Sequence, residues 1–381
     1  MSEPTTPLAT SPRATASLES GPAREGRVTV PHGGNLAEAV QRYGEHPDGW
    51  LDLSTGINPH GYPVPATSPA AWQRLPDERD DLEALAAHYY GAPQALAVAG
   101  SQPAIRALPA LLPNSTNQAT AIATLTYGEY LPAFLHAGHR VVRYGFEADP
   151  VPGLTAAADF CLSAARPLPQ DIQHLVLVNP NNPTARHVEP ATVLAWHAQL
   201  AARGGSLIVD EAFADVAPEF SVARFADRPG LIVLRSIGKF FGLAGARAGF
   251  VLATAQFLAT LRAELGPWTL SGPTREAVRA ALVDQSWQHA TRARLALDGE
   301  RLAQLLMQHD LPTYSTPLFA WVAHANAVAL QQRLAQHAIW VRRFDTPASL
   351  RFGLPASEAD WRRLEQALQA CAALIASSPY A

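Results

Sequence analysis

The stretch that most narrows the fold is SIGKFFGLAGARAG, residues 236–249, which places one lysine in a loop of small residues. Apolar runs on both sides of this loop have the length and composition of short buried strands. Lys239 is a candidate Schiff-base lysine, because an amine held near other cations can have a shifted pKa and attack an aldehyde. Ser236 and Arg247 add a hydroxyl and a guanidinium, and both groups suit a phosphate. The alternative is an ordinary solvated lysine.

Two further motifs follow apolar runs in the same part of the chain. The motif NPNNPT occupies residues 179–184 and follows LVLV, and DEAF occupies 210–213 and follows LIV. Each motif is expected at the carboxyl end of a buried strand, which is the edge where open α/β sheets bind ligands. The sequence therefore places an amide, a carboxylate and the lysine at one edge of one sheet.

The three motifs, in this order, resemble those of the class I/II aminotransferase superfamily, the fold-type I enzymes that use pyridoxal 5′-phosphate (PLP). The resemblance implies an α/β fold, with a mostly parallel central sheet in a large domain and a smaller α+β domain. It implies that Lys239 carries the cofactor, that Asp210 keeps its pyridine nitrogen protonated and that Asn182 hydrogen-bonds its ring oxygen. Many relatives add a tyrosine hydroxyl where this chain has Phe213. Tyr127 matches the aromatic residue that stacks on the cofactor ring, although a half-buried core tyrosine is the alternative.

A strand–turn–helix pattern at residues 97–103 is a candidate phosphate site. Gly100 supplies the turn, and we expect Pro103 at the first helical position, where its missing N–H is not needed. The free N–H groups of Ser101 and Gln102 would then point at an anion, helped by the helix dipole. Relatives have a similar glycine turn here, which assigns it to the cofactor's phosphate.

The amino-terminal part narrows the resemblance further. The motifs HGGN at 32–35 and LDLSTGINPHG at 51–61 resemble the L-threonine O-3-phosphate decarboxylase family of cobalamin biosynthesis. That family implies PLP-dependent decarboxylation of L-threonine O-3-phosphate to (R)-1-amino-2-propanol O-phosphate, a linker of the cobalamin nucleotide loop. Histidinol-phosphate aminotransferases share the lysine, asparagine and aspartate motifs but usually lack HGGN, so transamination is the alternative. A non-enzymatic regulator with a PLP fold is a weaker alternative, because the short tail has no helix-turn-helix pattern.

The substrate of such a decarboxylase carries a carboxylate and a phosphate. Arg351 matches the superfamily's arginine for the substrate anion, and Arg342 matches a second family arginine; bidentate guanidinium contacts suit both anions. His32 resembles a family residue near the substrate phosphate, with an ordinary loop histidine as the alternative. The expected substrate-binding side chains are those of His32, Ser54, Thr55, Asn58, Arg342 and Arg351.

Composition limits the other functional classes. The chain has 381 residues, a net charge of −4 and a pI of about 6.3, so no strong attraction to nucleic acid or anionic membranes is expected. Its only two cysteines, Cys161 and Cys371, favour a reducing compartment such as the cytoplasm over a disulfide framework. No apolar run reaches the roughly 18 residues that a membrane helix needs. The histidines are scattered, so no metal site is expected.

We expect the following organisation: a disordered tail at 1–27, an amino-terminal segment at 28–74 that joins the small domain and covers the active site, a large PLP-binding domain at 75–265, a connecting helix at 266–310 and a small carboxyl-terminal domain at 311–381. Relatives form homodimers with active sites at the subunit boundary, and we expect a homodimer here. Many of them place a tyrosine at the position of Leu75 that reaches the partner subunit's cofactor phosphate, a bond that Leu75 cannot make.

Overall fold

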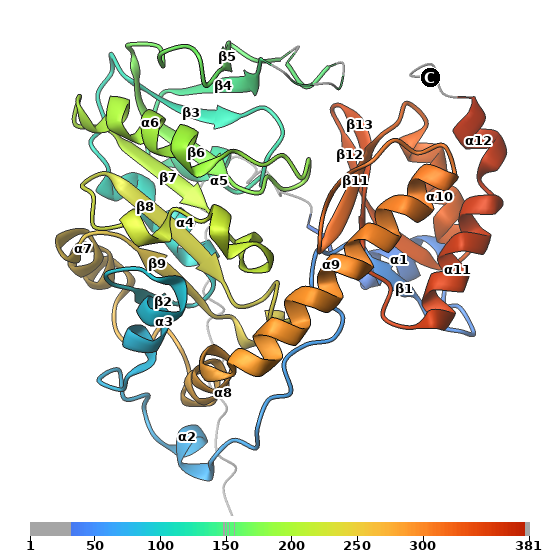
Figure 1. The fold of residues 1–381 in the computed structure, drawn as a ribbon, viewed down its shortest axis with the longest axis horizontal. Coiled ribbons are helices and arrows are strands. Elements are labelled where there is room, and N and C mark those ends of the chain that lie inside the picture. The colour runs from blue at the N-terminus through green and yellow to red at the C-terminus, as the bar shows by residue number, and fades with distance from the viewer. Residues whose placement is uncertain (1–31, 148, 150, 152, 156, 378–381) are drawn as a thin grey trace, which may run out of the picture. The chain divides into compact units, whose positions relative to one another are not determined.

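Two β-sheets organise the part of the chain that the structure describes (Figure 1). The computed structural model describes residues 32–147, 149, 151, 153–155 and 157–377, and the predicted tail at 1–27 lies outside them. The strands are β1 (Leu51–Leu53), β2 (Leu96–Val98), β3 (Ala119–Ala123), β4 (Val141–Phe146), β5 (Phe160–Leu162), β6 (Ile172–Val178), β7 (Ser206–Asp210), β8 (Leu231–Ser236), β9 (Gly249–Leu252), β10 (Tyr314–Thr316), β11 (Phe319–Ala323), β12 (Ile339–Asp345) and β13 (Ala348–Gly353). The α-helices are α1 (Leu36–Tyr43), α2 (Pro69–Gln73), α3 (Leu82–Tyr90), α4 (Ser101–Leu111), α5 (Tyr130–His136), α6 (Pro190–Ala201), α7 (Ala255–Leu265), α8 (Gly272–Val283), α9 (Gln285–Gln308), α10 (Ala327–Gln336), α11 (Glu358–Gln369) and α12 (Ala372–Ala376).

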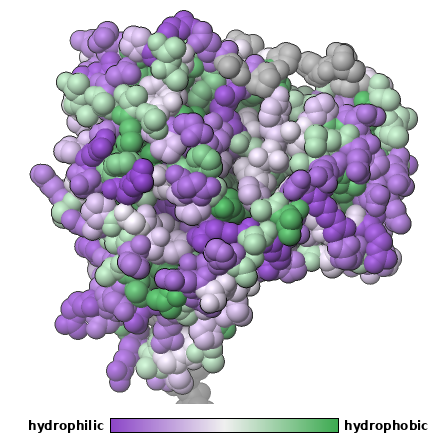
Figure 2. Space-filling model, viewed as in Figure 1, coloured by the Kyte–Doolittle hydropathy of each residue, from purple (hydrophilic) through white to green (hydrophobic). Residues whose placement is uncertain are grey.

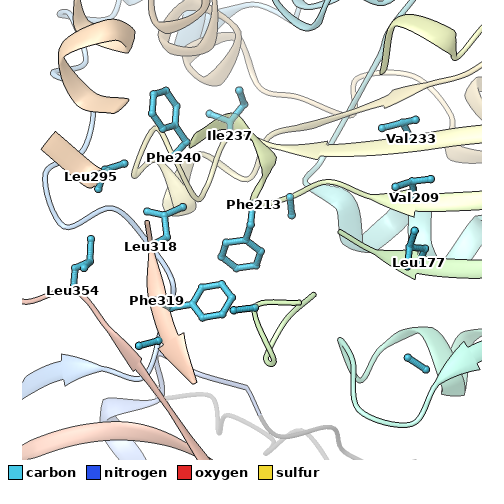
Figure 3. Close-up of a cluster of buried hydrophobic side chains, with 14 of the residues drawn as sticks. Leu177, Val209, Phe213, Val233, Ile237, Phe240, Leu295, Leu318, Phe319 and Leu354 are labelled. Carbon is cyan, nitrogen blue, oxygen red and sulfur yellow. The ribbon is translucent and has the colours of Figure 1, made fainter. Parts of the chain in front are cut away.

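The larger sheet has eight strands in the order β2-β9-β8-β7-β6-β3-β4-β5. The strands from β8 to β5 are parallel, and β9 runs antiparallel to both of its neighbours. Both faces are buried, so the strands are almost continuously apolar. Along β7, Ile208 packs with α4, α5 and α7, whereas Leu207 and Val209 belong to the cluster on the other face, with α6. Figure 3 shows Leu177, Val209 and Val233 side by side on β6, β7 and β8. The prediction of an α/β fold with a mostly parallel sheet is confirmed.

The smaller sheet has five strands in the order β1-β12-β13-β11-β10. β1 pairs in parallel with β12, so a strand from the amino-terminal segment joins strands from the end of the chain. The other pairs are antiparallel. One hydrophobic cluster continues from this sheet to the larger one, and Phe319 on β11 meets Phe213 after β7 edge to face, with ring centroids 5.0 Å apart (Figure 3). This contact joins the two sheets just beyond the carboxyl end of β7.

Two local expectations need correction. The helical stretch expected to connect the domains is two helices, because the Asp284 side chain accepts a hydrogen bond from the Trp287 N–H (2.9 Å) and starts α9 there. Helix α4 begins at Ser101 with Gly100 as its N-cap, so Pro103 is the third helical residue and not the first. At the start of α11, the side chains of Ser357 and Asp360 form a capping box.

The surface shows no broad apolar area on the face drawn in Figure 2, where hydrophobic side chains form small separate patches among hydrophilic ones. No helix within the described ranges is long and apolar enough to span a bilayer. Cys161 is exposed and Cys371 is buried, and both are free thiols.

Candidate functional site

The site lies at the carboxyl ends of β6, β7 and β8. β7 ends at Asp210 and β8 ends at Ser236, and both strands are buried along their whole length. Asn182 lies in the loop that follows β6, and its peptide bond to Pro183 is cis. Because parallel neighbouring strands end at one edge, the three motifs that are separate in the sequence meet there.

Asp210 is a buried carboxylate with two protein donors. Its Oδ2 accepts from the Tyr130 hydroxyl (2.8 Å) and its Oδ1 from the Ala212 N–H (3.0 Å). Burial raises the pKa of Asp210, while these two hydrogen bonds and the nearby Lys239 oppose that rise. Burial removes the water that would stabilise the charged carboxylate. A cationic N–H partner would replace that stabilisation, so the site suits one.

Lys239 lies in a cationic and largely dry environment. Its Nζ is 5.5 Å from the centre of the Phe213 ring. Burial first, and then the positive charges of Arg351 and Arg247, lower the pKa of Lys239 to about 8 against the opposing effect of Asp210. An amine with this pKa is partly neutral near physiological pH and can act as a nucleophile or as a proton carrier.

An anion-binding corner forms where the turn before α4 meets Arg247. Gly100 has φ +75°, and a Cβ there would lie 3.0 Å from an Nη atom of Arg247. A Cβ on Gly249 would come within 3.2 Å of the Ser101 nitrogen, so this backbone is closely packed as well. Ser236, the last residue of β8, is buried, and its Oγ accepts from the Gly238 N–H (3.3 Å). The first turn of α4 and one guanidinium thus lie side by side, at a turn whose positive φ favours glycine.

Tyr127 and Gln102 are joined by side-chain hydrogen bonds. The Tyr127 hydroxyl donates to Oε1 of Gln102 (3.0 Å), and Nε2 of Gln102 donates to Oε2 of Glu129 (2.5 Å). Burial, followed by the charges of Asp210 and Glu129, raises the pKa of Tyr127 to about 12, so its hydroxyl stays a donor at neutral pH. Tyr127 is thereby fixed beside the strand ends.

Arg351 and Arg342 lie directly opposite each other on β13 and β12. Opposite residues of an antiparallel pair share one face, so two cations stand side by side. Arg351 donates to Oδ1 of Asn182 through Nη1 and to the Ser54 carbonyl through Nη2 (2.6 Å). Burial and then Arg342 lower the pKa of Arg351 to about 10, which still leaves it charged at neutral pH. Burial likewise lowers the pKa of Arg342, whose guanidinium lies 5.3 Å from the Phe344 ring centre.

The other predicted substrate residues make contacts within the chain. Ser54 Oγ donates to Asp52 (2.6 Å) and accepts from the Gly34 N–H (2.7 Å). Asn58 is buried and donates to the Phe240 carbonyl (2.8 Å), which ties its amide to the Lys239 loop. Its substrate role stays a prediction.

Thr55 and His32 are the remaining predicted substrate residues of the amino-terminal segment. The Thr55 methyl faces Gly34, where an added Cβ would come within 3.3 Å. His32 reaches Glu129 with its Nε2 (2.7 Å). No group of three or more His, Cys, Asp or Glu suited to a metal is found among the residues that the structure describes.

Sequence reasoning missed two functional candidates, Glu129 and Tyr130. Both lie just after Tyr127, in a run that drew notice only for its aromatic residue. The indication in the sequence was the close grouping of Tyr127, Glu129 and Tyr130 shortly after a buried strand. Their partners, His32 and Asp210, are 97 and 80 residues away, and no local pattern indicates those pairings.

A cavity of about 490 Å³ lies beside the loop that follows Asn182. Its wall includes Thr184 and Ala185 of that loop, and Trp321, which lies opposite Arg351 in the register of β11 and β13. The side chains assigned above to the cofactor and the substrate do not line this cavity.

These residues fit PLP. The Gly100 corner with Arg247 suits a phosphate, buried Asp210 suits a protonated ring nitrogen, and Lys239 has the lowered pKa that an aldehyde-binding amine needs. Phe213 presents only its ring, so it offers no second hydrogen bond to a ring oxygen.

Comparison with known proteins gives the family. Residues 63–369 match the family described as aminotransferase class I and II. The threonine-phosphate decarboxylase of Pseudomonas aeruginosa is 46% identical over 338 residues, which cover 88% of this chain and 96% of that protein. That of a Sinorhizobium species is 43% identical over 352 residues, covering 89% and 97%. The solved histidinol-phosphate aminotransferase of Sinorhizobium meliloti, in complex with pyridoxal-5′-phosphate, superposes with a TM-score of 0.70 at 21% identity, covering 89% of this chain and 95% of that one, and confirms the fold. The chain belongs to the class I and II aminotransferase family.

Proposed function

We propose that this protein is a PLP-dependent threonine-phosphate decarboxylase, which converts L-threonine O-3-phosphate to (R)-1-amino-2-propanol O-phosphate and so serves the cobalamin nucleotide loop. One observation carries the proposal: Arg342 and Arg351 stand opposite each other in register, and Arg351 lies close enough to Lys239 to lower its pKa. Two adjacent guanidinium groups suit a substrate with two anionic groups. The relatives at 46% and 43% identity bear the same activity in their names.

We assign the cofactor roles as the family resemblance implies, and the contacts above are compatible with them. Lys239 would bind PLP covalently, Asp210 would hold the ring nitrogen and Asn182 the ring oxygen. Tyr127 would stack on the ring. The phosphate would lie against Gly100, Ser101, Gln102, Ser236 and Arg247. When bound, PLP would supply an electron sink for the bond that breaks at Cα.

The chain's residues then select that bond. Arg351 and Arg342 hold the carboxylate and the phosphate, which turns Cα so that its bond to the carboxylate is the one aligned for cleavage. That bond breaks, CO2 leaves, and the proton that replaces it on Cα comes from Nζ of Lys239, acting as a general acid. The apolar Phe213–Phe319 contact limits water at this point.

We further propose that the protein acts as a homodimer in the cytoplasm. Its low cysteine content, with both thiols free, supports a reducing compartment. Exposed apolar side chains near α2 support association.

The test is incubation of the PLP-loaded protein with L-threonine O-3-phosphate, with products identified by mass and released CO2 measured. We expect aminopropanol phosphate and equimolar CO2. Formation of a keto acid and pyridoxamine phosphate, with no CO2, would instead indicate an aminotransferase.

A further inference from the structure

Glu129 is a buried carboxylate in an unexpected place. Its side chain is 10% exposed and lies at the N-cap of α5. One oxygen accepts from His32 Nε2 (2.7 Å), and the other accepts from Gln102 Nε2 (2.5 Å) and lies 3.6 Å from a guanidinium nitrogen of Arg106. Gln102 belongs to the first turn of α4, where an anion is expected to bind. A second negative charge there weakens anion binding unless a cation offsets it.

His32 is the group that makes this arrangement useful. It is half-exposed, and its ring centroid is 6.0 Å from that of Tyr127. Its Nδ1 has no hydrogen-bond partner among the residues that the structure describes, while Nε2 is held by Glu129. A carboxylate on one ring nitrogen fixes the orientation of the ring, which leaves the other nitrogen, Nδ1, to face a ligand.

The residues after His32 are fastened to the other side of the site. A Cβ on Gly33 would lie 2.2 Å from the Ser54 carbonyl oxygen, so only glycine allows this approach. The Gly34 N–H donates to Ser54 Oγ (2.7 Å), with φ +83°. The same Ser54 carbonyl accepts from Nη2 of Arg351 (2.6 Å). Ser54 follows β1 of the smaller sheet, whereas Glu129 follows β3 of the larger one.

We propose that Glu129 is a positioning residue that anchors His32, the first residue of the segment 32–35, so that His32 faces the substrate's anionic group. The segment is held a second time through Gly34, which bonds to Ser54, and Ser54 in turn accepts from Arg351. This inference rests on the proposed function for the identity of that group. The anchoring itself depends only on contacts within the chain. Of the two glycines of the HGGN motif, Gly33 is required by its close approach to Ser54 and Gly34 is favoured by its positive φ, while the histidine makes the contact with Glu129.

The anchoring is tested without substrate, by hydrogen–deuterium exchange of the PLP-loaded protein and its Glu129→Gln variant. Glutamine keeps the size of the side chain but removes its charge. We expect faster exchange in peptides that contain Gly34, whose N–H is bonded to Ser54. Glu358→Gln is the matched control, because Glu358 also pairs with an arginine, Arg301, but on the exposed surface. Unchanged exchange around Gly34 in Glu129→Gln would overturn the proposal.

The positioning role is tested by a double-mutant cycle with Glu129→Gln and His32→Ala on threonine phosphate. Each single variant should raise KM about tenfold or more, with kcat changed far less. The KM of the double variant should be no higher than that of the more impaired single variant. Independent, multiplying effects on KM would show that Glu129 does not act through His32. A parent enzyme that releases no CO2 would refute the proposed function, while the exchange experiment would still decide the anchoring.

Discussion

At the scale of single residues, the pKa of Lys239 sets a testable pH dependence. Burial and the charge of Arg351 bring it to about 8 from the usual 10.5. Only the neutral amine attacks an aldehyde. The rate of covalent PLP attachment to the cofactor-free protein should therefore rise with pH and level off above about 8, as followed by stopped-flow absorbance. Arg351→Gln removes one cause and should move the midpoint upward. A rate that keeps rising to pH 10.5 in the parent would contradict the lowered pKa.

The same shift has a consequence for stability. Between pH 8 and 10.5 the unfolded chain keeps the Lys239 proton while the folded chain has lost it. Stability rises with pH wherever the unfolded state binds more protons. The contribution of Lys239 to the stability of the cofactor-free protein should thus be unfavourable below pH 8 and should fade as the pH approaches 10.5. Comparing urea unfolding of the parent and Lys239→Met across this window checks the sign.

Tyr130 should govern cofactor affinity through Asp210. Its hydroxyl donates to Oδ2 of Asp210 (2.8 Å), and a hydrogen bond to a charged group contributes about 1.5–3 kcal/mol. Tyr130→Phe keeps the buried ring but loses this bond, and PLP should bind about ten-fold to a hundred-fold more weakly, as measured by equilibrium dialysis. Tyr144→Phe is the control, since its buried hydroxyl donates to the Val176 carbonyl (2.9 Å). Equal losses of PLP affinity in both variants would refute a specific role for Tyr130.

The two substrate arginines should be separable from the cofactor chemistry. Arg351→Ala and Arg342→Ala should still bind PLP, because neither is assigned to it, but both should lose turnover on threonine phosphate. Removing one partner of a desolvated charged contact costs about 2–5 kcal/mol. That corresponds to a loss of about thirty-fold to several thousand-fold in kcat/KM.

One of the two arginines is expected to hold the phosphate. For the variant of that arginine, the loss in kcat/KM should be smaller on unphosphorylated threonine, because this substrate lacks the contact already. Steady-state kinetics on both substrates measures the difference. If both variants prefer the phosphorylated substrate as strongly as the parent does, neither arginine reads the phosphate, and His32 becomes the main candidate.

At the scale of elements, the start of α4 should tolerate no side chain at Gly100. An alanine Cβ there would meet Arg247 at 3.0 Å while φ is +75°, so both the guanidinium and the turn would be disturbed. PLP affinity of Gly100→Ala should fall by about tenfold or more. Gly266→Ala is the control, because φ is +74° there but nothing lies within 4 Å of the added atom. It imposes the same backbone strain on a helix end without touching the site. Similar PLP affinity in the two variants would contradict the predicted corner.

Elements were also the scale at which the sequence was most and least informative. The strands that lead to Asp210 and Lys239 are short apolar runs ended by small or charged residues, and their length and composition locate them. The break between α8 and α9 was missed because Asp284 is one polar residue in a long helical pattern. Its capping bond to the Trp287 N–H competes with helix continuation, and the sequence does not show which wins.

At the scale of the whole molecule, the sequence predicted which segments come together but not which residues pair. The carboxyl ends of parallel strands must meet, so the grouping of Asn182, Asp210 and Lys239 followed from strand order. The pairing of β1 with β12, and of His32 with Glu129, depends on how the amino-terminal segment returns to the site. Asn58 shows the same limit: its motif is real, but its amide holds the lysine loop, a role that no spacing rule reveals.

The predicted homodimer can be tested through exposed apolar side chains around α2. Trp72 is 72% exposed and Leu75 is 69% exposed. Trp268 is 52% exposed, and its backbone N–H donates to the Glu78 side chain (2.9 Å), close in the chain to Leu75. Large apolar side chains gathered at a surface favour association. Sedimentation should find a dimer, and the double variant Trp72→Ser and Leu75→Ser should shift it toward monomer.

Leu297→Ser is the matched control for the dimer experiment, because Leu297 is also 69% exposed but lies on α9. It should leave the sedimentation coefficient unchanged. If the site needs the partner subunit, activity of the Trp72 and Leu75 variant should fall upon dilution and return at high protein concentration, since association follows mass action. A monomer that keeps full activity at all concentrations would show that one chain completes its own site, and the assembly proposal would be wrong.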